Sequence, residues 1–450
     1  MIKIIKSKID DLHADPHISE VVRGNMLAFM LKVLGSGLAF GFNVAVARLL
    51  GAEGAGFYFL ALSITIIGSV IGRVGLDSSL LRFVATHAAL DEWDKVKGVY
   101  ALAVRLAIAM AGSVSAIFFI AAPWMTETLF SKPGLAEPLR WMSLSILPIA
   151  LLNLQAESLK GVKRIRDAML LQAIGPPLFS LLLIFPLTQL AGVSGAVGAY
   201  TLGSMMVALL GIWAWRNAMV RHKSLAVAYS FKELWASCKP LFIVSIAGHA
   251  IVPFAPILLL GIWASSEDVG VFGAASRVAM LVSFILITAN NVVAPKFAEL
   301  YARGDMESLG RTARRIAILM TLLASPIFLA LIFGGHWVMA MFGPGFENGA
   351  LMLAILAMGQ IVNLMTGSCG YLLVMSGNEI SLRNLTVWSA ALLLLLLLVF
   401  VPLLGAVGAA LASAISVAAM NILSVIRAQK LLGIRIAGFS MRRGNDVKAV

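Results

Sequence analysis

"GAGFYFLALSI" (residues 54–64) is the stretch on which the fold depends, because a related stretch, "DVGVFGAASRV" (residues 268–278), follows 214 residues later. This offset aligns Gly56 with Gly270. Both stretches lie in apolar runs, and about 20 apolar residues suffice for a helix to cross the hydrocarbon core of a bilayer. The pair is therefore the first of several signs that the chain is duplicated and embedded in a membrane.

Three further pairs of stretches support the duplication, and they occur in the same order in both halves of the chain. Each pair is weak alone, but together they predict two parallel repeats of six helices, since an even number of spans returns the chain to its starting side. The pairs are "LDSSLLRFVA" (76–85) with "NNVVAPKFAE" (290–299) at an offset of 214, and "RLAIAM" (105–110) with "RIAILM" (315–320) and "GAVGA" (195–199) with "GAVGA" (405–409) at 210.

The composition agrees with an integral membrane protein. Of the 450 residues, 60% are hydrophobic and 13% are charged, and the mean hydropathy is +0.94. Soluble domains are about 45–50% apolar and about 25% charged. The net charge of +13 does not indicate nucleic-acid binding, because the charges lie between apolar runs and form no continuous face. Cys238 and Cys369 lie in or beside apolar runs, so we expect packing residues rather than a disulfide or a metal site.

The apolar runs predict an all-α fold of twelve transmembrane helices, because a lone segment in lipid must satisfy its own backbone hydrogen bonds. We expect the tenth run to be broken or tilted. Pro253 and Pro256 are expected to bend the seventh. The predicted spans are residues 26–50, 56–81, 98–122, 139–159, 168–189, 193–215, 239–263, 269–294, 312–334, 349–375, 384–403 and 405–427.

Lys and Arg predict the orientation, since cytoplasmic loops are enriched in these residues. With the N-terminus in the cytoplasm, most of the 35 Lys and Arg fall on the inner side, and the outer ends and loops hold only Arg48, Lys132 and Arg140. Both termini are therefore predicted to be cytoplasmic. The predicted domains are a cytoplasmic N-terminal segment (1–25), a first lobe (26–216), a cytoplasmic linker (217–238), a second lobe (239–428) and a basic tail (429–450).

The first residues, "MIKIIKSKIDDLH" (1–13), place apolar side chains at helical spacing with lysines between them. This pattern is typical of a basic amphipathic helix on an anionic membrane surface. A frayed, charged terminus would give the same composition.

Ionisable residues inside the predicted spans are the candidates for function, because each costs about 2.5–3.5 kcal/mol at the bilayer centre. Four of them are cations and two are carboxylates, and a cationic surplus suits an anionic substrate such as a phosphate. The substrate-binding candidates are Arg277, Arg73, Asp77, Lys32 and Asn291, and the gate or coupling candidates are Arg82, Lys296, Arg105, Glu157 and His249.

Several candidates also have purely structural explanations. Arg73 and Asp77 are four residues apart and can pair on one helix face. Lys32 can extend its ammonium to the membrane surface. His249 is either a hydrogen-bonded core histidine or a proton-linked residue. Arg82 and Lys296 can anchor the inner ends of their helices.

The stretches "ARLLG" (47–51), "GFY" (56–58) and "GLDSSLLRF" (75–83), with "GAVGA" opening the last helix of each lobe, resemble the polysaccharide-biosynthesis flippases. These are the O-antigen and capsule flippases of the multidrug/oligosaccharidyl-lipid/polysaccharide exporter (MOP) superfamily. The resemblance implies a V-shaped, two-lobe transporter, similar to MATE transporters, in a bacterial inner membrane. It implies that the protein moves undecaprenyl-diphosphate-linked oligosaccharide, such as a lipopolysaccharide repeat unit, to the periplasmic leaflet by alternating access.

The same resemblance implies coupling to protons or sodium, for which Asp77, Glu157 and His249 are the candidates, and partners among the polysaccharide polymerase machinery. No resident cofactor or metal is expected. One alternative is a multidrug exporter of the same superfamily, although the first predicted span (26–50) lacks the acidic residue expected of one. A membrane glycan-assembly enzyme is a further alternative. It would need a large polar loop with clustered carboxylates or histidines, and the sequence has no such loop.

Overall fold

The computed structural model describes residues 16–222 and 227–434, and within these ranges the chain is helical and contains no strand. The predicted amphipathic segment (1–13) and most of the basic tail (429–450) lie outside the described residues. The first half holds α2 (Pro16–Arg73), α3 (Leu76–Ala89), α4 (Trp93–Trp124), η1 (Met125–Leu129), η2 (Pro133–Leu135), α5 (Ala136–Ser143), α6 (Ile146–Gly161), α7 (Ile165–Met169), η3 (Leu170–Ile174) and α8 (Gly175–Met219). The second half holds α9 (Phe231–Ser245), η4 (Ile246–Ile251), α10 (Val252–Trp263), α11 (Ser266–Ala302), α12 (Met306–Phe333), α13 (Gly335–Ala340), η5 (Phe346–Gly349), α14 (Ala350–Thr366), α15 (Cys369–Met375) and α16 (Glu379–Leu432).

Eight helical segments within the described ranges are long and apolar enough to cross a membrane, so the chain is a multi-pass membrane protein. Three of the long helices turn at a glycine with positive φ, namely Gly51 in α2, Gly192 in α8 and Gly405 in α16. Each glycine lies at the junction of two predicted spans, and glycine adopts positive φ without steric cost. The number of twelve spans and the location of both termini stay predictions.

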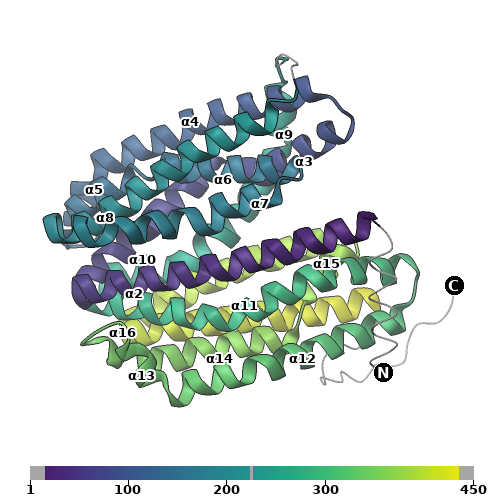
Figure 1. Ribbon diagram of the computed structural model, residues 1–450. Coiled ribbons are helices and arrows are strands. Elements are labelled where there is room, and N and C mark those ends of the chain that lie inside the picture. The colour runs from purple at the N-terminus through teal and green to yellow at the C-terminus, as the bar shows by residue number, and fades with distance from the viewer. Residues whose placement is uncertain (1–15, 223–226, 435–450) are drawn as a thin grey trace.

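The helices form two bundles that meet at one end (Figure 1). One apolar core is shared by both bundles and joins residues 42–64 of α2 to residues 269–286 of α11. Farther along, the core divides. One part lies among α3, α4, α6, α8 and α9, and the other among α11, α12, α15 and α16. We call the end near Arg48 and Lys132 the closed end, and the opposite end, where α2 begins and α16 ends, the open end.

The predicted second span (56–81) is wrong as a continuous helix, because it breaks at Val74 and Gly75. Their φ angles are 48° and 77°, which end α2 and begin α3. A Cβ on Gly75 would lie 2.7 Å from the backbone oxygen of Cys238, so α9 packs directly on the break. The expected break in the tenth span is confirmed. It falls at Gly367, whose φ is 66°.

The chain passes from one bundle to the other within the predicted seventh span. Leu234 and Cys238 of α9 belong to the core of the first bundle, whereas Ala255 and Leu260 of α10 belong to the shared core. Between α9 and α10 lies the π-helical segment η4, and Pro253 occupies the first turn of α10. The domain boundaries stay predictions.

The backbone also shows the duplication, with one change of register. Gly192 (φ 53°, ψ −126°) and Gly405 (φ 56°, ψ −132°) share one conformation. Gly195 and Gly408 each press against a carbonyl eight residues earlier in the chain. The offset here is therefore 213, and the predicted match of Gly195 with Gly405 is wrong by three residues. Only a glycine fits this close approach. The alignment of the two repeats therefore follows from packing and not from the repeated GAVGA stretch.

Candidate functional site

Arg73 and Asp77 form an ion pair across the break between α2 and α3. Arg73 Nη1 lies 2.9 Å from Asp77 Oδ2, and Arg73 Nε donates to the carbonyl of Ser69 at 3.3 Å. The side chains are 13% and 24% exposed. Asp77 lies in the first turn of α3, where the helix dipole favours a carboxylate. Its second oxygen, Oδ1, is buried and has no hydrogen-bond partner among the described residues. The predicted pair therefore exists, but it joins two helices instead of stabilising one.

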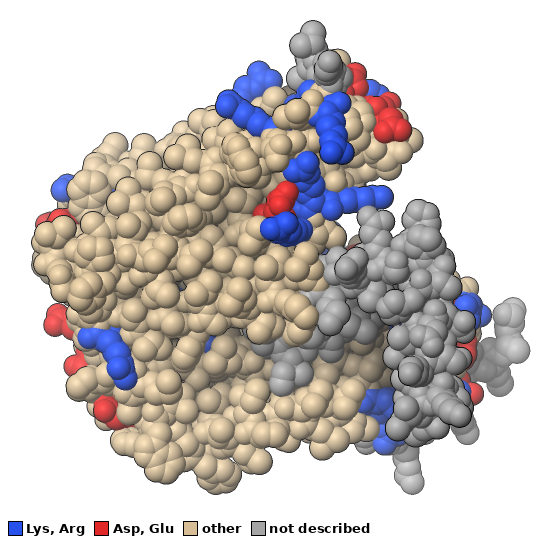
Figure 2. Space-filling model, in the orientation of Figure 1, with Lys and Arg blue, Asp and Glu red and all other residues tan. Residues whose placement is uncertain are grey.

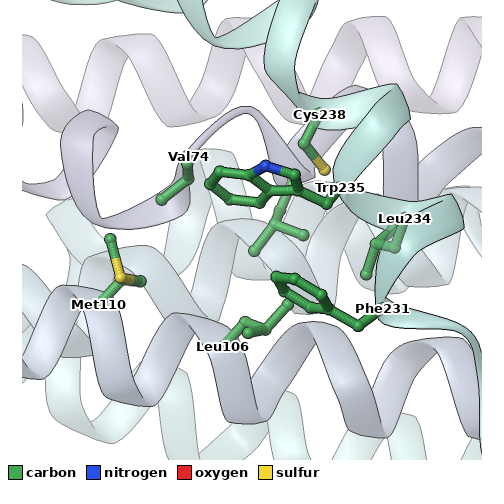
Figure 3. A pocket seen from close by; sticks show the side chains of 8 residues that line it. Val74, Leu106, Met110, Phe231, Leu234, Trp235 and Cys238 are labelled. Carbon is green, nitrogen blue, oxygen red and sulfur yellow. The ribbon is translucent and has the colours of Figure 1, made fainter.

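An apolar pocket of about 150 Å³ adjoins this break (Figure 3). Trp235 and Phe231 of α9 stack with 5.8 Å between ring centroids and face Met110 of α4. The pocket offers no polar group to a sugar or a phosphate. Sequence reasoning missed it, because the α9 residues that line it fall within the predicted linker (217–238) and their packing partners are distant in the chain. The eight lining residues are Val74, Leu76, Leu106, Met110, Phe231, Leu234, Trp235 and Cys238.

A second polar group of side chains, which we call the polar cluster, consists of Asn153, Glu157, Lys160 and Gln172. Lys160 Nζ donates to Glu157 Oε1 at 2.6 Å and to Gln172 Oε1 at 2.9 Å. Gln172 Nε2 in turn donates to Asn153 Oδ1 at 2.9 Å. Three of the four residues lie on α6, and the π-helical segment η3 supplies Gln172. π-Helical turns are frequent at functional sites.

Lys32 adds a second cation near the polar cluster. It is half-buried on α2, and its charge repels that of Lys160. One turn along α2, Gly35 packs against the backbone of Ala173, which holds α2 against η3. With Lys32, the polar cluster carries two cations and one carboxylate, beside two amide side chains. The sequence named Lys32 and Glu157, but it assigned Lys160 to an inner loop and missed both amides, which become informative only once α6 and η3 lie side by side.

Arg277 crosses from the second bundle to rings of the first. Its guanidinium carbon lies 4.1 Å from the centroid of the Phe59 ring, and Nη1 donates to the carbonyl of Gly273 at 3.1 Å. A cation over an aromatic face is attracted by the ring quadrupole. No carboxylate pairs with Arg277 in the part of the chain that the structure describes. Its role in lining a cavity stays a prediction.

The Phe59 ring under Arg277 belongs to a connected group of rings that we call the aromatic cage, comprising Phe42, Tyr58, Phe59 and Tyr200. The ring of Phe42 lies 6.0 Å from that of Tyr58 and 6.4 Å from that of Tyr200. Tyr58 and Phe59 are in edge contact at 5.7 Å. The cage belongs to the shared region between the bundles, so Arg277 lies where they meet.

The remaining candidates do not gather at one place. Arg82 Nη2 donates to Ser237 of α9 at 2.9 Å, and Lys296 pairs with Glu299 at 2.8 Å. Arg105 is exposed and donates to a carbonyl of its own helix. The expectation of a core histidine is wrong for His249, which is exposed in η4. The side chain of Asn291 lies outside those that the structure describes. Among the described residues, no group of three His, Cys, Asp or Glu is placed to hold a metal ion.

The surface charge is uneven along the molecule. Figure 2 shows Lys and Arg, with some Asp and Glu, gathered on the first bundle toward the open end, whereas most of the visible surface is uncharged. This distribution matches an apolar band that lies in lipid, with a cationic region at one end.

Comparison with known families identifies the chain. Residues 21–301 match the family described as polysaccharide biosynthesis protein. The chain belongs to this family. A curated relative is stage V sporulation protein B of Bacillus subtilis (strain 168), which is 23% identical over 140 residues. These residues are 31% of this chain and 26% of that relative, so the match spans about a quarter of the relative's length.

Two solved structures share the fold of this member of the polysaccharide biosynthesis family. One is a multidrug resistance MATE family transporter of the MOP superfamily in an inward-facing conformation, with a TM-score of 0.74 and 17% identity over 91% of this chain and 98% of that one. The other is the lipid II flippase MurJ in an inward closed conformation, with a TM-score of 0.74 and 13% identity over 91% of this chain and 88% of that one. The chain therefore has the fold of MOP-superfamily transporters, as the sequence predicted.

Proposed function

We propose that this protein is a flippase that moves a lipid-linked oligosaccharide, carried on undecaprenyl diphosphate, from the cytoplasmic to the periplasmic leaflet by alternating access. The single observation that carries the proposal is the polar cluster with Lys32, in which two cations outnumber one carboxylate beside two amides. Ammonium groups bind phosphate oxygens, and amide side chains both donate to and accept from sugar hydroxyls.

The architecture supports alternating access. The bundles share a core at the closed end and have separate cores at the open end, so they can rock about the shared region. Membership of the polysaccharide biosynthesis family and the fold shared with MurJ and a MATE transporter support transport of this kind. We further propose a bacterial inner-membrane location, an O-antigen or similar repeat unit as cargo, and the polymerase machinery as partner.

A binding experiment tests the proposal. Purified protein in nanodiscs is titrated with undecaprenyl diphosphate, and Lys32→Met and Lys160→Met are each expected to weaken binding about tenfold, since each removes one charged donor. Arg303→Gln is the matched control, because its side chain is 70% exposed and pairs only with Glu299 in the described structure. Equal binding by wild type, K32M and K160M would contradict the proposal.

The same titration separates the multidrug alternative. A lipophilic cation that binds tightly, and that the lipid diphosphate does not displace, would favour a multidrug exporter. In cells that lack the native gene, the K160M variant is expected to leave surface polysaccharide low at normal protein level, with lipid-linked oligosaccharide accumulating in the cytoplasmic leaflet.

A further inference from the structure

Lys132 joins the two bundles at the closed end. It lies between η1 and η2 of the first bundle, and its Nζ donates to two carbonyls of the second, those of Gly261 at 2.7 Å and Ala264 at 2.8 Å. These carbonyls are at the C-terminal end of α10, where carbonyl groups lack helical partners and the helix dipole favours a cation.

Arg48 of the first bundle makes a corresponding contact with a loop of the second bundle. It lies near the end of the first part of α2, and its Nε donates at 2.8 Å to the carbonyl of Met341, which follows α13 of the second bundle. The Cα of Arg48 is also 4.0 Å from where a Cβ on Gly343 would lie, so the loop after α13 rests on α2.

The two contacts are related by the duplication. An offset of 214 carries Arg48 to Ile262, between the two residues whose carbonyls bind Lys132. In both cases a loop of one bundle meets the end of a helix of the other. The chemistry is reversed, because the loop supplies the cation in one case and the carbonyl in the other.

These bonds have no counterpart at the open end. Within the described ranges, Arg48 and Lys132 supply the side-chain hydrogen bonds that join residues 16–222 to residues 252–434. Toward the open end the two bundles have separate cores. A bond made in one conformation only shifts the equilibrium toward that conformation. Two cations of the predicted outer side are thus used to hold the bundles together.

We propose that Arg48 and Lys132 form a two-point latch, which stabilises the conformation with the closed end shut and must open in each transport cycle. All three hydrogen bonds, one from Arg48 and two from Lys132, use a charged donor, which makes them stronger than bonds between neutral groups. That the latch opens in each cycle rests on the proposed alternating access. The bonds themselves do not depend on the cargo, so the distance measurement below can fail while the binding experiment on the polar cluster succeeds.

Spin labels on the two bundles measure the latch directly. Trp124 at the end of α4 and Trp337 in α13 are 63% and 74% exposed at the closed end, and each is replaced by cysteine for labelling. The native Cys238 and Cys369 are buried and can remain. Pulsed electron paramagnetic resonance then gives the distribution of distances between the labels in nanodiscs.

Arg48→Gln and Lys132→Met are each expected to shift the ratio of short to long distances about tenfold toward long ones. The double variant is expected to shift it further, and Lys132→Arg to keep the short distance. Arg140→Gln is the matched control, because Arg140 is also an exposed cation of the predicted outer side and makes no cross-bundle bond in the described structure.

Size-exclusion profiles establish that each variant is folded, and the single variants decide the matter if the double variant is not. A double variant, or a pair of folded single variants, with the wild-type distance distribution would overturn the latch. A shift in the R140Q control as large as that in R48Q or K132M would overturn it equally, because general loss of charge would then be the cause.

Discussion

Gly56 and Gly270 lie against each other where the two bundles cross, and each occupies the same place in its own repeat. A Cβ on Gly56 would overlap the backbone oxygen of Ser266, and a Cβ on Gly270 would overlap that of Ala52. Ser266 and Ala52 are themselves related by the offset of 214. The contact is thus two-fold symmetric. Small residues at a helix crossing let backbones approach closely, which is a main source of helix association in membranes.

Gly56→Ala and Gly270→Ala are expected to destabilise the protein by a similar amount, roughly 1–3 kcal/mol each, because either methyl group forces α2 and α11 apart. Melting temperature in detergent, followed by light scattering or intrinsic fluorescence, measures the effect. Gly112→Ala in α4 is the control, since a Cβ there meets nothing within 4 Å. Alanine is the better helix former, so G112A should keep or raise the melting temperature. An equal loss in G112A would show that the close approach at the crossing is not what sets the cost.

Gly75→Ala is expected to destabilise the protein more than Gly304→Ala. Both glycines have positive φ, 77° and 71°, so alanine is strained at either position. A Cβ at Gly75 also lies 2.7 Å from the backbone oxygen of Cys238, whereas a Cβ at Gly304 meets nothing within 4 Å. The difference in melting temperature between G75A and G304A therefore isolates the contact between α9 and the break. No difference would mean that α9 yields to the added methyl group.

The ion pair of Arg73 and Asp77 is expected to show a coupling of about 1–2 kcal/mol in a double-mutant cycle of R73Q and D77N. Removing one partner leaves a mostly buried charge without its counterion. The losses of stability in the two single variants should therefore add up to more than the loss in the double variant.

The matched cycle uses Arg311 and Glu307, whose charged atoms lie 3.7 Å apart and whose side chains are 60% and 82% exposed. Exposed pairs contribute little, so a coupling below about 0.5 kcal/mol is expected there. Melting in detergent serves both cycles. Equal coupling in the two cycles would show that the ion pair at the break between α2 and α3 contributes no more to stability than an exposed pair.

Glu92 is expected to make stability depend on pH. Hydrogen bonds from Lys95 and from His87, each at 2.7 Å, lower the pKa of its carboxyl group from the ordinary value. A carboxyl group with a lowered pKa stabilises the fold above its unfolded pKa, which is about 4.3, and this stabilisation is lost as pH falls through the folded pKa.

The melting temperatures of wild type and E92Q should therefore differ at neutral pH and converge below about pH 4. E307Q is the control, because Glu307 is 82% exposed and makes only the long contact with Arg311 in the described structure. A difference between wild type and E92Q that persists unchanged to pH 3 would mean that the ionised carboxylate is not its source.

Most of the candidate site could not be predicted from spacing along the chain. Glu157 and Lys32 stood out because a charge in an apolar run is rare, but Lys160, Asn153 and Gln172 carried no such signal. Gln172 acquires its role when η3 turns it toward α6. Of the two roles predicted for His249, the hydrogen-bonded core residue is wrong, because the side chain is exposed in η4.

The sequence by itself determined that this protein is a helical, duplicated membrane chain. The reason is that the free-energy cost of burying a backbone group or a charge in lipid depends on each residue and its near neighbours in the chain. The pairing of Gly56 with Gly270 was also in the sequence, as a matched offset. Only the tertiary structure decided that these two glycines touch, that α2 breaks under α9, and that Arg48 and Lys132 reach carbonyls of the opposite bundle. Those contacts join atoms more than a hundred residues apart in the chain, and local sequence patterns do not determine which helix surfaces pack together.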